Sequence, residues 1–165
     1  MTRRPRVAAG IAALTALALL SAPLQGRTVG DWQMRAWDGL GCGAEQVVLG
    51  RATGATLAEV VLFPRPDGAV MLVRVPTGVR LSDGIAYRHG PGDTTGVGLA
   101  WQDCSPRRCA ALAQIDGAEL RRLLAGREIH LGYRPTRTAP PLNVPVSLMG
   151  LTRTWEQVRA CPPAP

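Results

Sequence analysis

The residues best suited to chemistry are four cysteines, two of which, Cys104 and Cys109, lie in the stretch WQDCSPRRCAALAQI. Four thiolates could bind a zinc ion, but structural zinc sites favour paired Cys-x2-Cys motifs. Here one pair has four residues between its members, and Cys42 and Cys161 each stand alone. The sequence therefore favours disulfides over a metal site, and the four cysteines allow three different pairings.

A reactive dithiol is the other chemistry that this loop could support. Arg107 and Arg108 lie between the two cysteines, and nearby positive charge favours the reactive thiolate. Oxidoreductase pairs, however, are typically Cys-x-x-Cys at the start of a helix, whereas Cys104 and Cys109 separate two strand-like runs. A periplasmic thiol-active accessory factor or enzyme that uses these cysteines remains the alternative to a structural disulfide.

Other patterns for catalysis are weak. The sequence contains no G-x-S-x-G, P-loop or H-E-x-x-H motif. His89 lies near Asp93 in a predicted loop, where a solvated histidine is commoner than an acid–base catalyst. His130 shares a strand face with Glu128, which predicts a surface pair. We predict no catalytic residue, no cofactor and no metal ion.

The N-terminal segment indicates the compartment. Arg3, Arg4 and Arg6 precede an uncharged apolar run that ends near Ala22 and is followed by small and turn-forming residues. This order is typical of a secretory signal peptide, and the run is shorter than the roughly 20 residues that a bilayer requires. We predict a signal peptide at 1–26 and one domain at 27–165, without a transmembrane segment after cleavage.

The charge of the chain is moderate once the signal peptide is discounted. The formal net charge of +7 comes from 19 arginines and 12 acidic residues, with no lysine. Removal of residues 1–26 takes away three arginines and leaves 16 − 12, or +4. A basic surface attracts anionic proteins, glycans or lipids. Nucleic-acid binding is not predicted, because one Phe and two Tyr supply too few stacking groups.

Short runs with alternating apolar and polar residues dominate the rest of the chain. This period of two, separated by turn signals such as Pro66-Asp67-Gly68, predicts antiparallel strands. About nine short strands at this spacing indicate an all-β antiparallel sandwich or barrel. Pro145 interrupts its run, which predicts an edge strand or a bulge. The runs are 30–37, 45–52, 57–64, 69–76, 84–88, 96–102, 109–115, 127–134 and 142–149.

Two segments have helical rather than strand spacing. Asp116 is a suitable N-cap, Glu119 follows three residues later, and Gly126 ends the pattern. In the second segment, 150–161, apolar residues recur at spacings of four and three, which predicts another turn or two of helix. We therefore expect one or two short helices.

Four blocks of the chain carry a resemblance to a known family. The blocks are VGDWQMRA (29–36), VRVPTGVRLSDGIAYR (73–88), CSPRRCAA (104–111) and VPVSLMGLTRTWEQV (144–158). In this order and spacing they resemble the invasion-associated locus B (IalB) family, exported proteins of Gram-negative bacteria with an immunoglobulin-like β-sandwich. Two positions depart from the family pattern, because Ala36 stands where a cysteine is frequent and Arg108 where a glycine is frequent.

The resemblance implies a pairing of the cysteines and a class of function. It favours a Cys104–Cys109 disulfide, which leaves Cys42 to pair with Cys161. It further implies a non-enzymatic cell-envelope protein, periplasmic, bound to the outer membrane or secreted, that supports host-cell invasion or envelope integrity. The expected partner is an envelope or host-surface protein, a glycan or an anionic lipid, and Arg107 and Arg108 are the expected contact surface.

Overall fold

The computed structural model describes residues 28–90 and 92–162, and the predicted signal peptide at 1–26 lies outside them. Strands make up most of the described chain, together with two α-helices, α1 (Gly117–Ala125) and α2 (Leu151–Arg159), and a short 3-10 helix at Leu81–Asp83. The strands are β1 (Thr28–Val29), β2 (Trp32–Trp37), β3 (Gly41–Leu49), β4 (Thr56–Arg65), β5 (Gly68–Pro76), β6 (Ile85–Arg88), β7 (Val97–Cys104), β8 (Arg108–Asp116), β9 (Glu128–Tyr133) and β10 (Leu142–Ser147).

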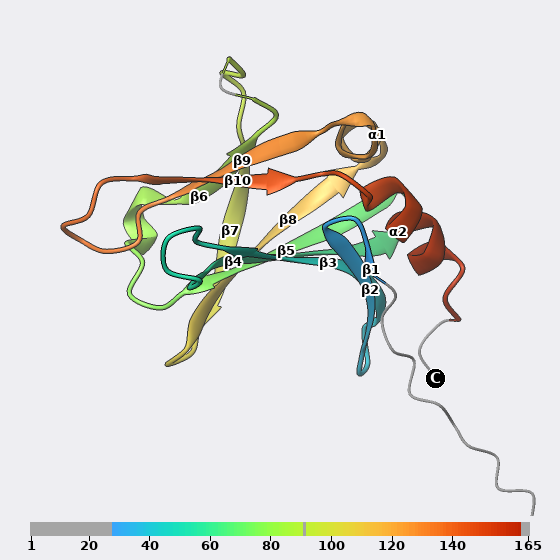
Figure 1. Cartoon of the computed structure of the whole chain (residues 1–165), viewed down its shortest axis with the longest axis horizontal. Helices are drawn as coiled ribbons and strands as arrows, with labels where there is room; N and C mark the ends of the chain where they lie inside the picture. The colour runs from blue at the N-terminus through green and yellow to red at the C-terminus, as the bar shows by residue number, and fades with distance from the viewer. Residues whose placement is uncertain (1–27, 91, 163–165) are drawn as a thin grey trace, which may run out of the picture.

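All strands pair in antiparallel fashion in the single order β1-β2-β3-β4-β5-β8-β7-β6-β9-β10. The sheet curls into a half-barrel, so that β9 and β10 lie across from β3, β4 and β5 (Figure 1). The all-β antiparallel class with two helices is thus confirmed. The immunoglobulin-like division into two separate sheets is not confirmed, because one continuous order connects the strands.

Side-chain hydrogen bonds join strands that are far apart in the sheet and so stabilise its curled shape. The Trp32 indole N–H donates to the Ser147 carbonyl at 2.8 Å, which joins β2 to β10. The Tyr133 hydroxyl donates to the Leu57 carbonyl at 2.7 Å, which joins β9 to β4. Buried donors in a core of this kind usually find such partners, and here the partners bring opposite parts of the sheet together.

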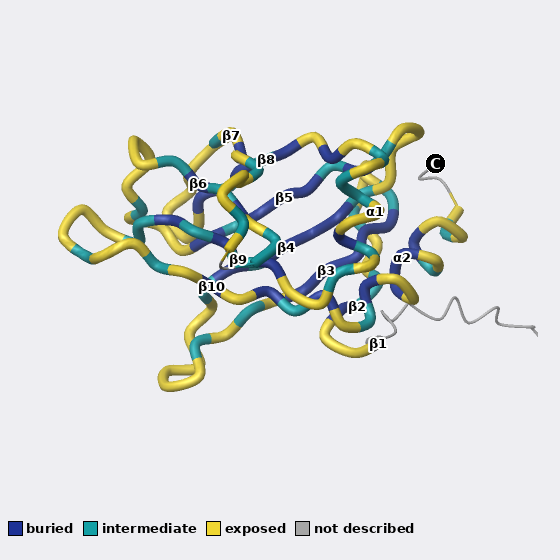
Figure 2. Tube along the Cα trace, turned by 90° about the horizontal axis from the view of Figure 1, so that it is seen from above, coloured by how far each residue is buried: buried dark blue, intermediate teal, exposed yellow. Residues whose placement is uncertain are grey.

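The core fills the inside of the curl. In strands such as β8 and β9 the buried residues alternate with more exposed ones, as the period of two predicts. Figure 2 shows the buried stretches running along the strands while most connecting loops are exposed. Strands from both sides of the curl contribute to one cluster of buried side chains. Its larger members include Trp32, Leu62, Met71, Tyr87, Ile129 and Leu131.

The first predicted helix is confirmed, with a different reason for its end. The Asp116 carboxylate accepts a hydrogen bond from the Glu119 backbone N–H at 2.8 Å, as an N-cap does. Gly126 has an ordinary φ of −77°, so left-handed backbone does not explain the glycine. A Cβ atom there would lie 2.8 Å from the Leu148 side chain. Close packing against the segment after β10 therefore accounts for Gly126.

The second helix is also confirmed, and its apolar face covers one end of the core. Leu151, Trp155 and Val158 are all buried, which agrees with their spacing of four and three. Helix α2 packs on β2 and β3. Directly after it, Cys161 forms a disulfide with Cys42 of β3, 119 residues earlier in the chain. Closure of so long a loop contributes about 5 kcal/mol to the free energy of unfolding in the chain-entropy model.

Candidate functional site

The second disulfide closes the tip of the β7–β8 hairpin. Cys104 and Cys109 lie opposite each other in the strand register and are bonded. The Ser105 hydroxyl oxygen accepts hydrogen bonds from the backbone N–H groups of Arg107 and Arg108, at 3.3 and 3.2 Å. The bond and the turn together restrict the loop to one shape. The tip is exposed and extends away from the curled sheet (Figure 1).

The two arginines of this tip have different environments. Arg107 is exposed, and its side chain has no hydrogen bond or ion pair with another residue that the structure describes. The Arg108 guanidinium lies 3.2 Å from a Glu59 carboxylate oxygen of β4, and its side chain is 52% exposed. We expected the hairpin to present both arginines to solvent. Both are exposed, but they differ in their contacts, because the Arg108 guanidinium pairs with Glu59 of β4.

Glu59 belongs to a row of charged and aromatic side chains on the outer face of the sheet. We call this row the outer-face ladder. The Arg35 and Arg74 guanidinium carbons each lie 4.6 Å from the centre of the Trp37 ring, a distance at which a cation is attracted to an aromatic face. Glu59 accepts hydrogen bonds from Arg74 and Arg108. The ladder consists of Glu45, Arg35, Trp37, Arg74, Glu59 and Arg108, from β2, β3, β4, β5 and β8.

The far end of the ladder is fixed by a buried carboxylate. The Glu45 side chain is 1% exposed and accepts hydrogen bonds from Arg35 at 3.0 Å and from the Gln33 side-chain amide at 2.8 Å. A buried charge is tolerated only when it is paired in this way. The Trp37 indole nitrogen, by contrast, is buried without a hydrogen-bond partner among the described residues. The ladder therefore combines fixed charges with one unused donor.

An apolar groove of about 630 Å³ lies beside the ladder on the same face. Phe63 borders both, because its ring meets Trp37 edge to face at 5.9 Å between ring centres. Leu40, at one side of the groove, is 64% exposed, and such a residue next to an apolar floor is a frequent mark of an interaction site. The apolar part of its lining includes Leu40, Phe63, Val70, Leu72 and Leu112, and the charged part consists of Arg65, Arg74, Arg108 and Asp103.

The histidine that the sequence singled out belongs to another cluster. His89 Nε2 lies 2.5 Å from a Glu119 carboxylate oxygen of α1, and the Tyr87 hydroxyl donates to the same oxygen at 2.7 Å. Burial and the adjacent Glu119 charge raise the pKa of Tyr87. The backbone N–H of His89 also donates to Asp93. These contacts connect β6 and the loop after it to α1 through the Glu119 side chain.

Two further expectations concern His130 and metal binding. His130 Nε2 lies 3.0 Å from the Glu128 carboxylate, the surface pair that the strand alternation predicts. Within residues 28–90 and 92–162, no group of three or more His, Cys, Asp or Glu side chains is placed to hold a metal ion. Over the same ranges, no helix has the length and apolar character needed to cross a membrane.

Sequence reasoning identified the hairpin but not the ladder. Its members lie on five strands, so no local motif contains them. One signal was present, because Arg35 and Trp37 alternate onto the outward face of the first long strand. A single outward aromatic residue is common on protein surfaces, so this signal alone does not identify a contact site. Its partners Arg74 and Glu59 become visible only once the strand register is known.

Comparisons with known proteins agree with this architecture. A crystal structure of invasion associated protein B from Bartonella henselae matches with a TM-score of 0.70 and 19% identity, over 82% of this chain and 96% of that one. At this identity the likeness shows the fold. No curated protein matches the chain. The family model for the invasion associated locus B protein matches residues 32–159, and because these are most of the sequence, the chain belongs to the invasion associated locus B family.

Proposed function

We propose that this protein is exported through a signal peptide at 1–26 and acts in the cell envelope, without catalysis, by binding a partner through the outer face of its sheet. Family membership supports an invasion-associated envelope role. Two disulfides support an oxidising compartment. The role is support of host-cell entry or of envelope integrity, in the periplasm, at the outer membrane or after secretion.

The observation that carries this proposal is the position of Trp37 between Arg35 and Arg74 beside an apolar groove. Tryptophan and arginine are the residues that contribute most to binding at protein interfaces. The guanidinium groups are already held by Glu45 and Glu59, so a partner would find them ordered and association would cost less entropy. Such a face suits an envelope or host-surface protein with exposed carboxylates and apolar side chains, and also anionic glycans or lipids.

Cross-linking in intact cells tests the proposal. A photo-reactive amino acid replaces Arg107 at the hairpin tip in one variant and Arg137, in the exposed loop between β9 and β10, in a matched control. We expect the photo-reactive residue at position 107 to capture a defined partner that the one at position 137 does not capture. We expect the additional change Trp37→Ala to abolish this capture. Equal capture at both positions would contradict the outer face as the contact site. A deletion strain with unchanged envelope integrity and host entry would contradict the envelope role.

A thiol-active accessory factor is the second candidate. The observation in its favour is that Cys104 is exposed at the hairpin tip while Cys109 is buried, so one sulfur is accessible to an attacking thiolate. A thiol-reactive mass tag, applied after mild reduction, distinguishes the candidates. Rapid labelling of Cys104 and Cys109 alone would favour the thiol-active candidate. Four protected cysteines favour disulfides that serve only the structure.

A further inference from the structure

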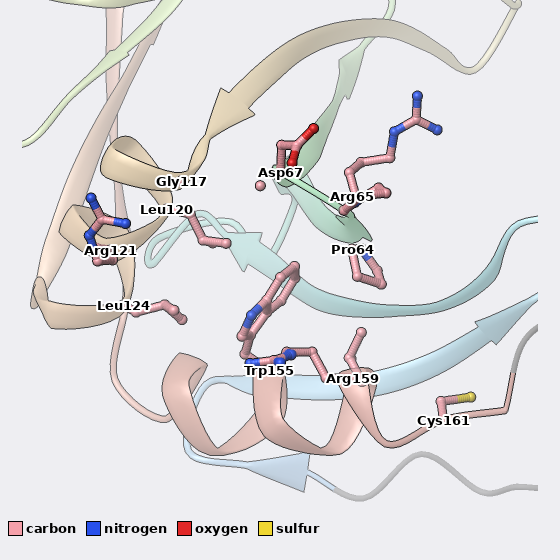
Figure 3. Close-up of a pocket in the computed structure, with 13 residues that line it drawn as sticks. Pro64, Arg65, Asp67, Gly117, Leu120, Arg121, Leu124, Trp155, Arg159 and Cys161 are labelled. Atoms are coloured by element: carbon pink, nitrogen blue, oxygen red, sulfur yellow. The ribbon is translucent and has the colours of Figure 1, made fainter.

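A second groove lies at the end of the molecule where the two helices meet the β4–β5 turn (Figure 3). Its walls are α1, α2 and the turn at 64–68, and its volume is about 830 Å³. This volume is in the range of roughly 300–1,000 Å³ that is usual for binding pockets. No residue of the outer-face ladder lines it, although Pro64 and Arg65 line both this groove and the apolar groove beside the ladder. We call this second groove the helix groove.

The floor of the helix groove is apolar. Leu120 and Leu124 come from α1, and Trp155 and Val158 come from α2. In Figure 3 the Trp155 ring stands between α2 and the β4–β5 turn, with Leu120 and Leu124 beside it. Leu120 and Leu124 are only partly buried. An apolar side chain placed between them would therefore remove further apolar surface from water, which is favourable.

The border of the groove is positively charged. Arg65, Arg121 and Arg159 stand around it, each from a different element, and Asp67 is the acidic residue in the lining. All three arginines are exposed, and none has a side-chain hydrogen bond or ion pair with another described residue. Elsewhere in the fold, exposed arginines such as Arg107, Arg137 and Arg153 likewise have no such partner among the described residues, whereas Arg35, Arg74, Arg80, Arg108, Arg122 and Arg134 pair with carboxylates. The lining thus has three arginines and one carboxylate, which gives a net positive charge around an apolar floor.

The groove is also held in shape by its neighbours. The Cys42–Cys161 disulfide fixes the chain directly after α2, and Asp116 caps the start of α1. Both walls are thus ordered without a partner, which lowers the entropic cost of binding.

We propose that the helix groove binds an acidic peptide segment of another protein, with one or two apolar side chains on the floor and carboxylates on the three arginines. Guanidinium groups recognise carboxylates with paired hydrogen bonds. Three cations from separate elements match charges spread along a peptide better than the single head group of one lipid. A concave site with a largely buried Trp155 is also poorly shaped for a flat bilayer. Residues 1–27 of this chain contain no Asp or Glu, so that segment does not supply the ligand.

A panel of labelled synthetic dodecapeptides tests the proposal. Each peptide alternates Glu with neutral residues and carries Leu, Phe or Trp at one or two positions that move along the panel. We expect at least one to bind in the micromolar range, as measured by fluorescence polarisation. Replacement of its Glu residues by Gln, or of its apolar residues by Ala, should weaken binding about tenfold or more. If no peptide binds, the proposal is wrong.

Matched variants locate the binding. Arg121→Glu and Arg159→Glu should each weaken binding about tenfold. Arg153→Glu, the same charge change at an exposed position of α2 outside the groove lining, should change it much less. Equal losses in all three variants would indicate general electrostatics and overturn the proposal, provided that circular dichroism shows all three folded.

Two further measurements separate this site from its alternatives. If vesicles of phosphatidylglycerol and phosphatidylcholine bind in a manner sensitive to Arg121→Glu while no peptide binds, the ligand is a lipid and the peptide proposal is wrong. Trp37→Ala, in the outer-face ladder, should leave peptide binding unchanged. Loss of peptide binding in that variant would mean that the peptide binds the outer face, which would support the proposed function and contradict the helix groove.

Discussion

Ala36 lies directly opposite Cys42 in the pairing of β2 with β3. The family pattern that this chain resembles frequently has a cysteine at position 36, yet here Cys42 is bonded to Cys161. In this chain the bond joins Cys42 of β3 to the segment after α2. The bond consequently attaches α2 to the sheet.

The two disulfides should contribute unequally to stability. Cys161→Ala opens a closure of 119 residues, whereas Cys104→Ala opens one of five. The chain-entropy model predicts losses in the free energy of unfolding of about 5 and about 2 kcal/mol. Urea denaturation, with the matching Cys42→Ala and Cys109→Ala changes included to avoid free thiols, measures both. Equal losses of unfolding free energy in the two variants would contradict the expectation that the longer closure stabilises the fold more.

A cysteine introduced at position 36 should take over the bond. In the double variant Ala36→Cys, Cys161→Ala, the new thiol lies opposite Cys42, and cysteines at facing strand positions are close enough to join. We expect mass spectrometry of the alkylated protein to find residues 36 and 42 linked. The single variant Cys161→Ala should show a free Cys42 as the control. A free thiol at both positions of the double variant would contradict the prediction.

Stability should fall at alkaline pH because of Tyr87. Burial, followed by the Glu119 hydrogen bond and charge, raises the pKa of its hydroxyl in the folded protein. The unfolded chain loses this proton near pH 10, so above that pH the folded state binds more protons and becomes less stable. The contribution of the protonated Tyr87 hydroxyl to folding stability is therefore complete below about pH 10 and is lost as the pH rises further. The variant Tyr87→Phe should flatten this decline in a series of denaturation curves. An unchanged slope would show that another group titrates.

Removal of the Glu59 charge should lower the free energy of unfolding more than removal of Arg108, the more exposed of its two arginine partners. Its side chain is 14% exposed and serves both Arg74 and Arg108. Glu59→Gln should cost about 1–3 kcal/mol of unfolding free energy, because a partly buried Arg74 loses its carboxylate. Arg108→Gln should cost about 0–1 kcal/mol, since Arg108 is half exposed. Thermal and urea unfolding compare the two. A larger loss in Arg108→Gln would contradict Glu59 as the centre of the ladder.

Local patterns in the sequence predicted the elements well. The alternation of apolar residues in REIHLGYR corresponds to β9, and the spacing of Leu151, Trp155 and Val158 corresponds to α2. These features depend on residues that are near one another in the chain. Pro145 also lies in β10, which pairs with β9 alone, as the prediction of an edge strand requires.

Features that depend on distant residues were not predictable in this way. Strand β3 begins at Gly41, four residues before the expected run, because the register with β2 extends pairing through the small residues Gly41 to Ala44. The single curled order of strands likewise depends on which edges meet, and a hydrogen bond such as that from Trp32 to Ser147 has no local signature. For the same reason Arg74 and Glu59, whose partners lie on other strands, were missed as members of the candidate site.

The Cys42–Cys161 bond has a consequence for resistance to proteolysis and to mechanical force. It makes a covalent ring of most of the domain, in which the second ring at Cys104–Cys109 is enclosed. A protease that cuts one exposed loop between positions 42 and 161 would leave a single molecule whose pieces cannot diffuse apart. A force applied at the two ends would likewise extend only the residues outside the ring. The domain therefore stays in one piece after a single cut in this region, and it resists extension between the two cysteines.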